Sequence, residues 1–220
     1  MAPLVYDIIN EVATSISNGR TVDALVSSHK AHEEFKEHMA KATPQILQNT
    51  ATGNGLGFIT AIAIPLLPCS SSDIGCSKAF LLTGNKAMVL SKQYIGLSFA
   101  VLKYNYALSL QLQVGPGAEG YQQQAFYQYK QCLQVVQKAE CGNCGMELAI
   151  ACLHNMAILH FNTGAFSEAT TTIRYAIEVL KAATDHSQLL SLDEETVRGL
   201  VRSGKIIPFC ANLINAAPAA

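Results

Sequence analysis

The chain has 220 residues, half of them hydrophobic, and only 14% are charged, against about a quarter in an average soluble domain. A formal net charge of −1, with no cluster of lysine and arginine, excludes the positive surface by which proteins bind nucleic acid or anionic membranes. A soluble monomer of this size normally carries more charge. We therefore expect part of the surface to lie against another protein.

The first 49 residues read as amphipathic helices. Apolar residues recur at helical spacing from Leu4 to Ser17, and Asn18-Gly19 supplies the glycine that often closes a helix. Thr21 can cap a second helix that continues to about Lys41, and Thr43-Pro44 favours a short continuation to about residue 49. The start of the chain lacks a basic region followed by an apolar run. We therefore expect no signal peptide and favour an intracellular protein.

Residues 50–76 are predicted to form a long loop with an apolar first half and a polar second half. The longest apolar run, from Leu56 to Pro68, has thirteen residues, which is too short to span a bilayer, and Pro65 would interrupt a helix. We predict that this run is buried or forms an interface, and it is our first candidate for partner binding. Its candidate partner-binding residues are Phe58, Ile59, Ile62, Ile64, Leu66 and Leu67.

Residues 77–140 predict an elongated helical hairpin. The longest helical pattern runs from Ser77 to Gln113 with one interruption near residues 83–85, and Gly115-Pro116-Gly117 ends it. A second helix is expected from about Glu119 to Glu140. The sequence predicts no sheet.

The clearest pattern lies between residues 146 and 183. Apolar residues at helical spacing fill two segments separated by Asn162-Thr163-Gly164, which predicts an antiparallel helical hairpin. Small residues let the two helices approach closely. The apolar positions are Leu148, Cys152, Met156, Leu159, Phe166, Ala169, Ile173, Ala176, Ile177 and Leu180.

This hairpin resembles a tetratricopeptide repeat (TPR) over about one unit of 34 residues. The matched positions are Ala157, Gly164, Phe166, Ala169, Ala176 and Ile177. The usual Trp and Tyr of the family are Leu153 and His160 here, and the final Pro is absent. The resemblance implies stacked hairpins that bind protein segments along a concave face, with packing inside the chain as the alternative. The concave-face positions are Ala151, His154, Ile158, Phe161 and Asn162.

A degenerate second repeat is predicted 44 residues upstream. Its four positions, Ala125, Tyr129, Cys132 and Leu133, have the spacing of Ala169, Ile173, Ala176 and Ile177. At the other end of the chain, residues 191–216 predict two short helices. A capping box from Ser191 to Glu194 begins the first, Ser203-Gly204 ends it, and Pro208 opens the second.

Cys141-x-x-Cys144 is the sharpest chemical motif. Two thiols at this spacing can share a metal ion or form a disulfide. Free, inert thiols are our main expectation, whereas a disulfide, here or in the loop at 69–76, and a metal site are the alternatives. Further zinc ligands near in sequence are Cys132, Cys152 and His154.

Other candidate sites are weaker. His29, His32 and Glu33 share one helical turn and could contact a metal, but the surrounding lysines and glutamates indicate an ordinary solvated face. No nucleophile elbow surrounds the serines at 71–72, and the glycines at 53–57 lack the Lys-Ser/Thr of a phosphate loop. We therefore assign no catalytic, cofactor-binding or metal-binding residue.

Together these patterns predict a single all-α domain over residues 1–220, made of antiparallel hairpins stacked as a short TPR-like solenoid, with a helical N-terminal segment. The predicted function is non-catalytic protein–protein association, as a structural subunit of a homo-oligomer or a larger complex. A transient peptide-binding adaptor and a cysteine-based metal or redox protein are the alternatives. Nucleic-acid binding, membrane insertion and a cofactor are not expected.

Overall fold

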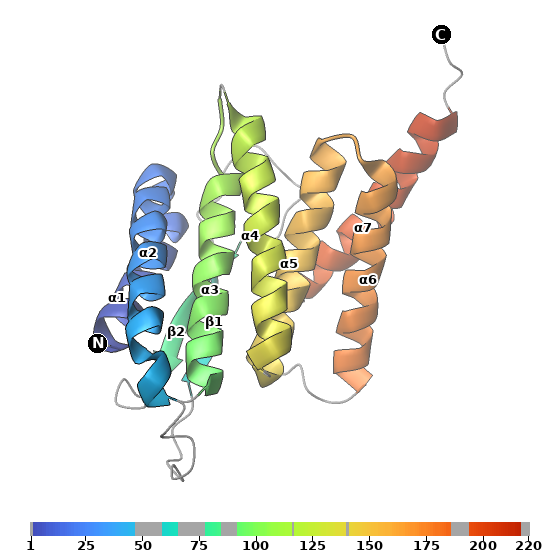
Figure 1. The fold of residues 1–220 in the computed structure, drawn as a ribbon. Coiled ribbons are helices and arrows are strands. Elements are labelled where there is room, and N and C mark those ends of the chain that lie inside the picture. Colours follow the sequence, from blue (N-terminus) through green and yellow to red (C-terminus); the bar gives the residue numbers. More distant parts are fainter. Residues whose placement is uncertain are drawn as a thin grey trace. The chain divides into compact units, whose positions relative to one another are not determined.

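Most of the chain is helical in the computed structural model, which describes residues 2–46, 59–65, 78–84, 92–115, 117–139, 141–185 and 194–216 (Figure 1). The predominantly helical fold predicted from the sequence is therefore confirmed. In chain order, the elements are α1 (Ala2–Ser17), α2 (Thr21–Ile46), β1 (Ile59–Pro65), β2 (Lys78–Gly84), α3 (Lys92–Gln111), α4 (Ala118–Ala139), α5 (Gly142–Asn162), α6 (Phe166–Asp185) and α7 (Glu194–Ala216).

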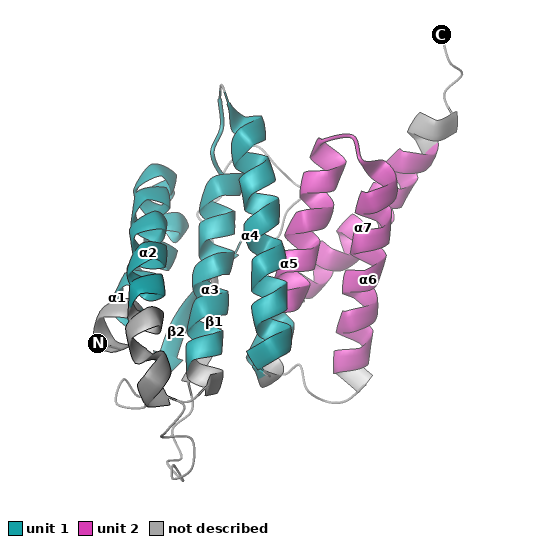
Figure 2. Cartoon of the chain, viewed as in Figure 1, with its two compact units in different colours: residues 1–69, 78–148 teal, residues 70–77, 149–220 magenta. Residues whose placement is uncertain are grey.

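The chain divides into two compact units (Figure 2). Unit 1 comprises Met1–Cys69 and Lys78–Leu148, so it contains α1 to α4, both strands and the first turns of α5. Unit 2 comprises Ser70–Ser77 and Ala149–Ala220, so it contains the rest of α5 together with α6 and α7.

In unit 1, α1 ends where the glycine pattern predicted the end of a helix, and α2 packs against it. Gly19 has a φ of 73°, and its N–H donates to the carbonyl of Ile16 at 2.9 Å. A side chain is disfavoured at that backbone angle, so glycine ends α1 at low cost. Buried residues recur along α1 at helical spacing and form one face, at Ile9, Val12, Ala13 and Ile16.

The central helix of unit 1 is α3, which packs against α1, α2, α4 and both strands. Because it is surrounded, its apolar residues occupy all sides rather than one stripe. Its buried apolar residues are Leu97, Ala100, Val101, Leu102, Tyr104, Ala107, Leu108 and Leu110. Gly96 permits close contact with α4, because a Cβ there would overlap that of Ala139.

The expectation that the chain contains no sheet was wrong at residues 59–65 and 78–84. These segments form a two-stranded antiparallel sheet in which Ile62 lies opposite Leu81 and Ile59 lies opposite Gly84. β1 replaces part of the predicted loop at 50–76, and β2 replaces the start of the helical pattern from Ser77. Short apolar runs do not distinguish strand from helix by periodicity, and the isoleucines of β1 favour a strand.

Two asparagines fix β2 to the helices of unit 1. The amide of Asn105 in α3 both accepts from the N–H and donates to the carbonyl of Phe80, at 3.0 and 2.8 Å. Asn10 in α1 makes the same pair of bonds to Leu82, at 2.8 and 2.9 Å. Each amide satisfies a backbone donor and a backbone acceptor that β1 does not reach.

In unit 2, α5 and α6 are separated by the turn that the sequence predicted, and α7 packs against α6. Gly164, with a φ of 78°, lies in the turn between α5 and α6. The two short C-terminal helices predicted from Ser203-Gly204 and Pro208 are instead one helix, α7, with Pro208 inside it. Gly204 lies inside the helix and allows α7 to pack closely on α6. A Cβ at this position would overlap the side chain of Ile177 in α6.

The second helices of the two hairpins bury the same pattern of positions. Three of the four positions are buried in each helix and the fourth is half-buried, although the two sets lie 44 residues apart. The buried trio is Ala125, Tyr129 and Cys132 in α4, and Ala169, Ile173 and Ala176 in α6. The half-buried residues are Leu133 and Ile177.

Candidate functional site

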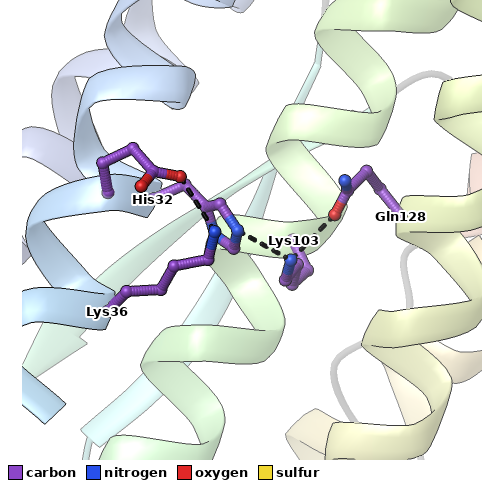
Figure 3. Close-up of polar contacts among 5 residues, drawn as sticks. His32, Lys36, Lys103 and Gln128 are labelled. Carbon is purple, nitrogen blue, oxygen red and sulfur yellow. Dashed lines mark hydrogen bonds and ion pairs between the residues drawn. The ribbon is translucent and has the colours of Figure 1, made fainter. Parts of the chain in front are cut away.

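The most polar buried cluster of unit 1 is centred on Lys103 of α3, whose exposed fraction is 5% (Figure 3). Its Nζ donates to Gln128 Oε1 of α4 at 2.9 Å and lies 3.2 Å from Nε2 of His32 in α2. The same ammonium lies 5.1 Å from the ring centroid of Phe99. His32 stacks on that ring at a centroid distance of 5.9 Å. The cluster therefore joins three helices through one amine.

Burial shifts both titratable groups of this cluster toward their neutral forms. Desolvation, together with the positive charge of Lys36, lowers the pKa of Lys103 to about 8. Desolvation and the nearby Lys103 lower the pKa of His32 to about 4. A neutral imidazole that accepts at Nε2 carries its proton on Nδ1. That Nδ1 is buried and has no hydrogen-bond partner among the described residues.

The geometry does not favour a metal at His29, His32 and Glu33. Nε2 of His32 faces an ammonium group, and Glu33 accepts a 2.9 Å hydrogen bond from Lys36. Among the described residues, no group of three or more His, Cys, Asp or Glu side chains could hold a metal ion. The amine of Lys103 is also too enclosed to meet a substrate, so the cluster is best explained as internal support of the helices.

The thiols at the turn between α4 and α5 are free. Cys141 is half-buried and lies close to two glycines, because a Cβ added to Gly145 would lie 2.7 Å from its Cβ and one added to Gly96 would lie 3.8 Å from its Sγ. Desolvation, and then the nearby Cys132 and Cys144, raise the pKa of Cys141 to about 11. A thiol with a raised pKa is a poor nucleophile, which agrees with the expectation of inert thiols.

Part of the concave face expected from the TPR resemblance is inside unit 2. His154 has an exposed fraction of 1%, and its Nε2 lies 2.8 Å from Oγ of Ser203 in α7. Ile158 and Ala151 are also buried. The partner-binding prediction was therefore wrong for these three residues, because side chains enclosed by their own chain cannot contact a partner.

The remaining candidates fall into three groups. Phe161 is half-buried and packs edge-on against Phe166 at a centroid distance of 5.4 Å, whereas Asn162 is exposed. Ile59, Ile62 and Ile64 belong to β1. Phe58, Leu66 and Leu67, like the proposed disulfide at 69–76 and the capping residue Ser191, lie outside the described residues.

An exposed stripe along α7 was not found from the sequence. Val201 and Phe209 have exposed fractions of 41% and 62%, and the exposed Arg202 and Lys205 lie between them. Val201, Lys205 and Phe209 follow one another at intervals of four residues and Arg202 adjoins Val201, so the four share one side of a helix with 3.6 residues per turn. The opposite side is buried and includes Leu200, Ser203, Ile207 and Ala211. Between Val197 and Asn212 the helix carries no acidic residue.

Among the described helices, residues Cys144–Asn162 of α5 are long and apolar enough to cross a membrane by length and composition. Of this segment, 72% is buried inside the fold, as in the core helix of a globular protein. Comparison with protein-family models, curated proteins and solved structures found no match to this chain.

Proposed function

We propose that the chain is a non-catalytic subunit that associates with another protein through the outer side of α7. The observation that carries this proposal is the stripe formed by Val201, Arg202, Lys205 and Phe209. A large exposed aromatic side chain is a common anchor of protein interfaces. Full burial of a side chain of this size contributes about 1.5–3 kcal/mol, which is enough to matter for affinity.

The chemistry of the stripe indicates the kind of partner. Two apolar side chains and two cations without an acidic neighbour on α7 complement an amphipathic helix whose polar side is acidic. Such a helix would lay its apolar side over Val201 and Phe209 and place carboxylates near Arg202 and Lys205. The nearby cations would increase the association rate and make it sensitive to salt.

The helical hairpins support the same function. The TPR resemblance of α5–α6, together with the shared burial pattern of α4 and α6, favours a TPR-like repeat for α3–α4 as well. Repeat units of this kind pack against their neighbours, and proteins built from them use the surface of the stack to bind other proteins. The internal use of Lys103, His32, His154 and Ser203 gives no reason to prefer an enzyme.

The test uses a synthetic amphipathic helical peptide with leucines on one side and glutamates on the other. The wild-type protein should bind it, with affinity that falls as salt is raised, and Phe209→Ala and Arg202→Glu should each weaken binding at least tenfold. Tyr175→Ala is the matched control, since Tyr175 is an aromatic residue of α6 with an exposed fraction of 56%. Equal binding by wild type and both α7 variants would contradict the proposal.

A further inference from the structure

The two outer edges of the β1–β2 sheet differ in how their backbone groups are bonded. At the outer edge of β2, Asn105 and Asn10 occupy the backbone N–H and carbonyl groups of Phe80 and Leu82. In an antiparallel ladder, alternate residues direct these groups to opposite sides. The backbone N–H and carbonyl groups of Ala79, Leu81 and Thr83 therefore point toward β1. The register places Ile64, Ile62 and Thr60 opposite these three residues.

The same alternation identifies the outer groups of β1. Ile59, Ala61, Ala63 and Pro65 are opposite Gly84, Leu82, Phe80 and Lys78, so their backbone groups point away from β2. Within the parts of the chain that the structure describes, the sheet has two strands, and none pairs with this edge. Three of the four residues retain an N–H there, and Pro65 has only a carbonyl.

The composition of β1 does nothing to oppose pairing with another strand. Proteins usually protect an open edge with a charged side chain, a bulge or a central proline. β1 has no charged residue, and its only proline is the last residue of the strand. The asparagines protect β2, but no comparable device is found among the seven residues of β1.

We propose that the open edge of β1 pairs with the β1 of a second copy of this chain, antiparallel and related by a twofold axis at Ile62. This register places Ala61 opposite Ala63 of the other copy and Ile59 opposite its Pro65. Each pair exchanges backbone hydrogen bonds, and the missing N–H of Pro65 affects only the two ends. Two sheets of two strands become one sheet of four, a size with independent stability.

A second copy fits this edge better than an unrelated peptide. The strand is self-complementary under the twofold axis: uncharged residues meet uncharged residues, and the only position without a donor lies at the end of the pairing. A twofold interface is also closed, so it produces a dimer rather than a fibre. This inference does not depend on the stripe of α7, which belongs to the other unit.

The first experiment is light scattering over a dilution series. The wild type should have twice the 23.6 kDa mass of one chain at micromolar concentration. Ala61→Pro removes an outward N–H without removing a bond to β2, so it should give one chain mass with an unchanged helical circular dichroism spectrum. Val26→Lys is the control, because it adds a charge at an exposed apolar residue of α2 and should leave the dimer intact.

The second experiment tests the register and does not depend on a disruptive substitution. Residues at the twofold axis form a non-hydrogen-bonded pair with Cα atoms about 4.5 Å apart, which suits a disulfide. Ile62→Cys should therefore give a covalent dimer on mild oxidation by oxidised glutathione, with the link mapped by mass spectrometry to two copies of position 62, and Val26→Cys should not.

A wild-type monomer at all concentrations, or a dimer that survives Ala61→Pro while Ile62→Cys gives no link at position 62, would overturn the β1 pairing. If Phe209→Ala dissociates the dimer into monomers and Ala61→Pro does not, the proposed pairing of two β1 strands is wrong and the α7 proposal is supported instead. Binding of an added β1 peptide by a monomer would likewise exclude a second copy as the occupant.

Discussion

Nζ of Lys103 lies 3.2 Å from Nε2 of His32, so a buried amine and a buried imidazole share one contact between α3 and α2. The third member of the cluster, Gln128, extends the contact to α4 at 2.9 Å. A buried polar group costs little while it is bonded and a great deal once its partner is lost. The cluster therefore makes the packing of α2, α3 and α4 selective for one arrangement.

We expect Lys103→Met to lower the free energy of unfolding by about 1–3 kcal/mol, because it leaves Nε2 of His32 buried without a partner. Adding His32→Phe should restore much of the loss, since both buried polar groups are then gone and a ring still faces Phe99. Urea denaturation followed by circular dichroism measures both values. Lys181→Met, at an exposed lysine of α6, is the control. Additive losses in the double variant would contradict this explanation.

Gly96→Ala should destabilise the protein by about 1–3 kcal/mol, because the new Cβ would overlap that of Ala139 where α3 meets α4. Gly120→Ala is a matched change in α4, and no atom lies within 4 Å of the added Cβ. It should instead stabilise the helix by up to ~1 kcal/mol. Thermal unfolding of both variants measures the difference, and equal effects would show that the close approach at Gly96 does not matter.

Glu147 should make the protein less stable as the pH rises from about 4.5 to about 7. Its exposed fraction is 3%, and burial raises its pKa from 4.5 to about 7. The folded state therefore keeps a proton that the unfolded state has released, so raising the pH favours unfolding, by up to ~3 kcal/mol in total. Glu147→Gln should remove this part of the pH dependence in urea denaturation. An unchanged pH profile would contradict it.

His154 should make the protein less stable as the pH falls, whereas Glu147 should do so as the pH rises. Burial lowers its pKa from 6.5 to about 4, so the unfolded state takes up a proton first as the pH falls. Its contribution to stability is present above about 6.5 and is lost as the pH falls through about 4. His154→Gln should flatten the decline in unfolding free energy over this range, as measured by urea denaturation at a series of pH values, and an unchanged decline would show that His154 does not cause it.

Cys141 should react slowly with iodoacetamide. A pKa raised from 9.0 to about 11 reduces its thiolate fraction about 100-fold at pH 8. Peptide mass spectrometry can compare its alkylation rate with that of free cysteine, and unfolding in urea should restore the ordinary rate. Fast alkylation in the folded protein would support the redox alternative raised by the Cys-x-x-Cys motif.

The sequence predicted helices wherever the pattern was local. The turn at Gly164 and the end of α1 near Gly19 follow from glycine and spacing within a few residues, and both glycines have a positive φ. The sheet was missed because short apolar runs do not distinguish a strand from a helix. The bond from Asn10 to Leu82, which helps to hold β2 in place, spans 72 positions and leaves no local pattern. α7 was divided wrongly because Gly204 was interpreted as a helix end, whereas its neighbour is Ile177 of α6.

The candidate sites show the same limit. The burial of His154 depends on Ser203, which lies 49 positions away, so it could not be predicted from the hairpin alone. Lys103 and Asn105 did leave a signal, because they are polar residues within an otherwise apolar helix. Such residues are usually bonded inside the fold.

From the asparagine bonds we also expect an order of folding within unit 1. The α1–α2 and α3–α4 hairpins close short loops and can form early, as local contacts do. β2 can be fixed only after α1 and α3 have come together, because Asn10 and Asn105 approach it from positions 72 and 25 residues away. Closing the longer of these loops carries the larger entropic cost. We therefore expect the backbone amides of Phe80 and Leu82 to be among the last in unit 1 to gain protection during refolding.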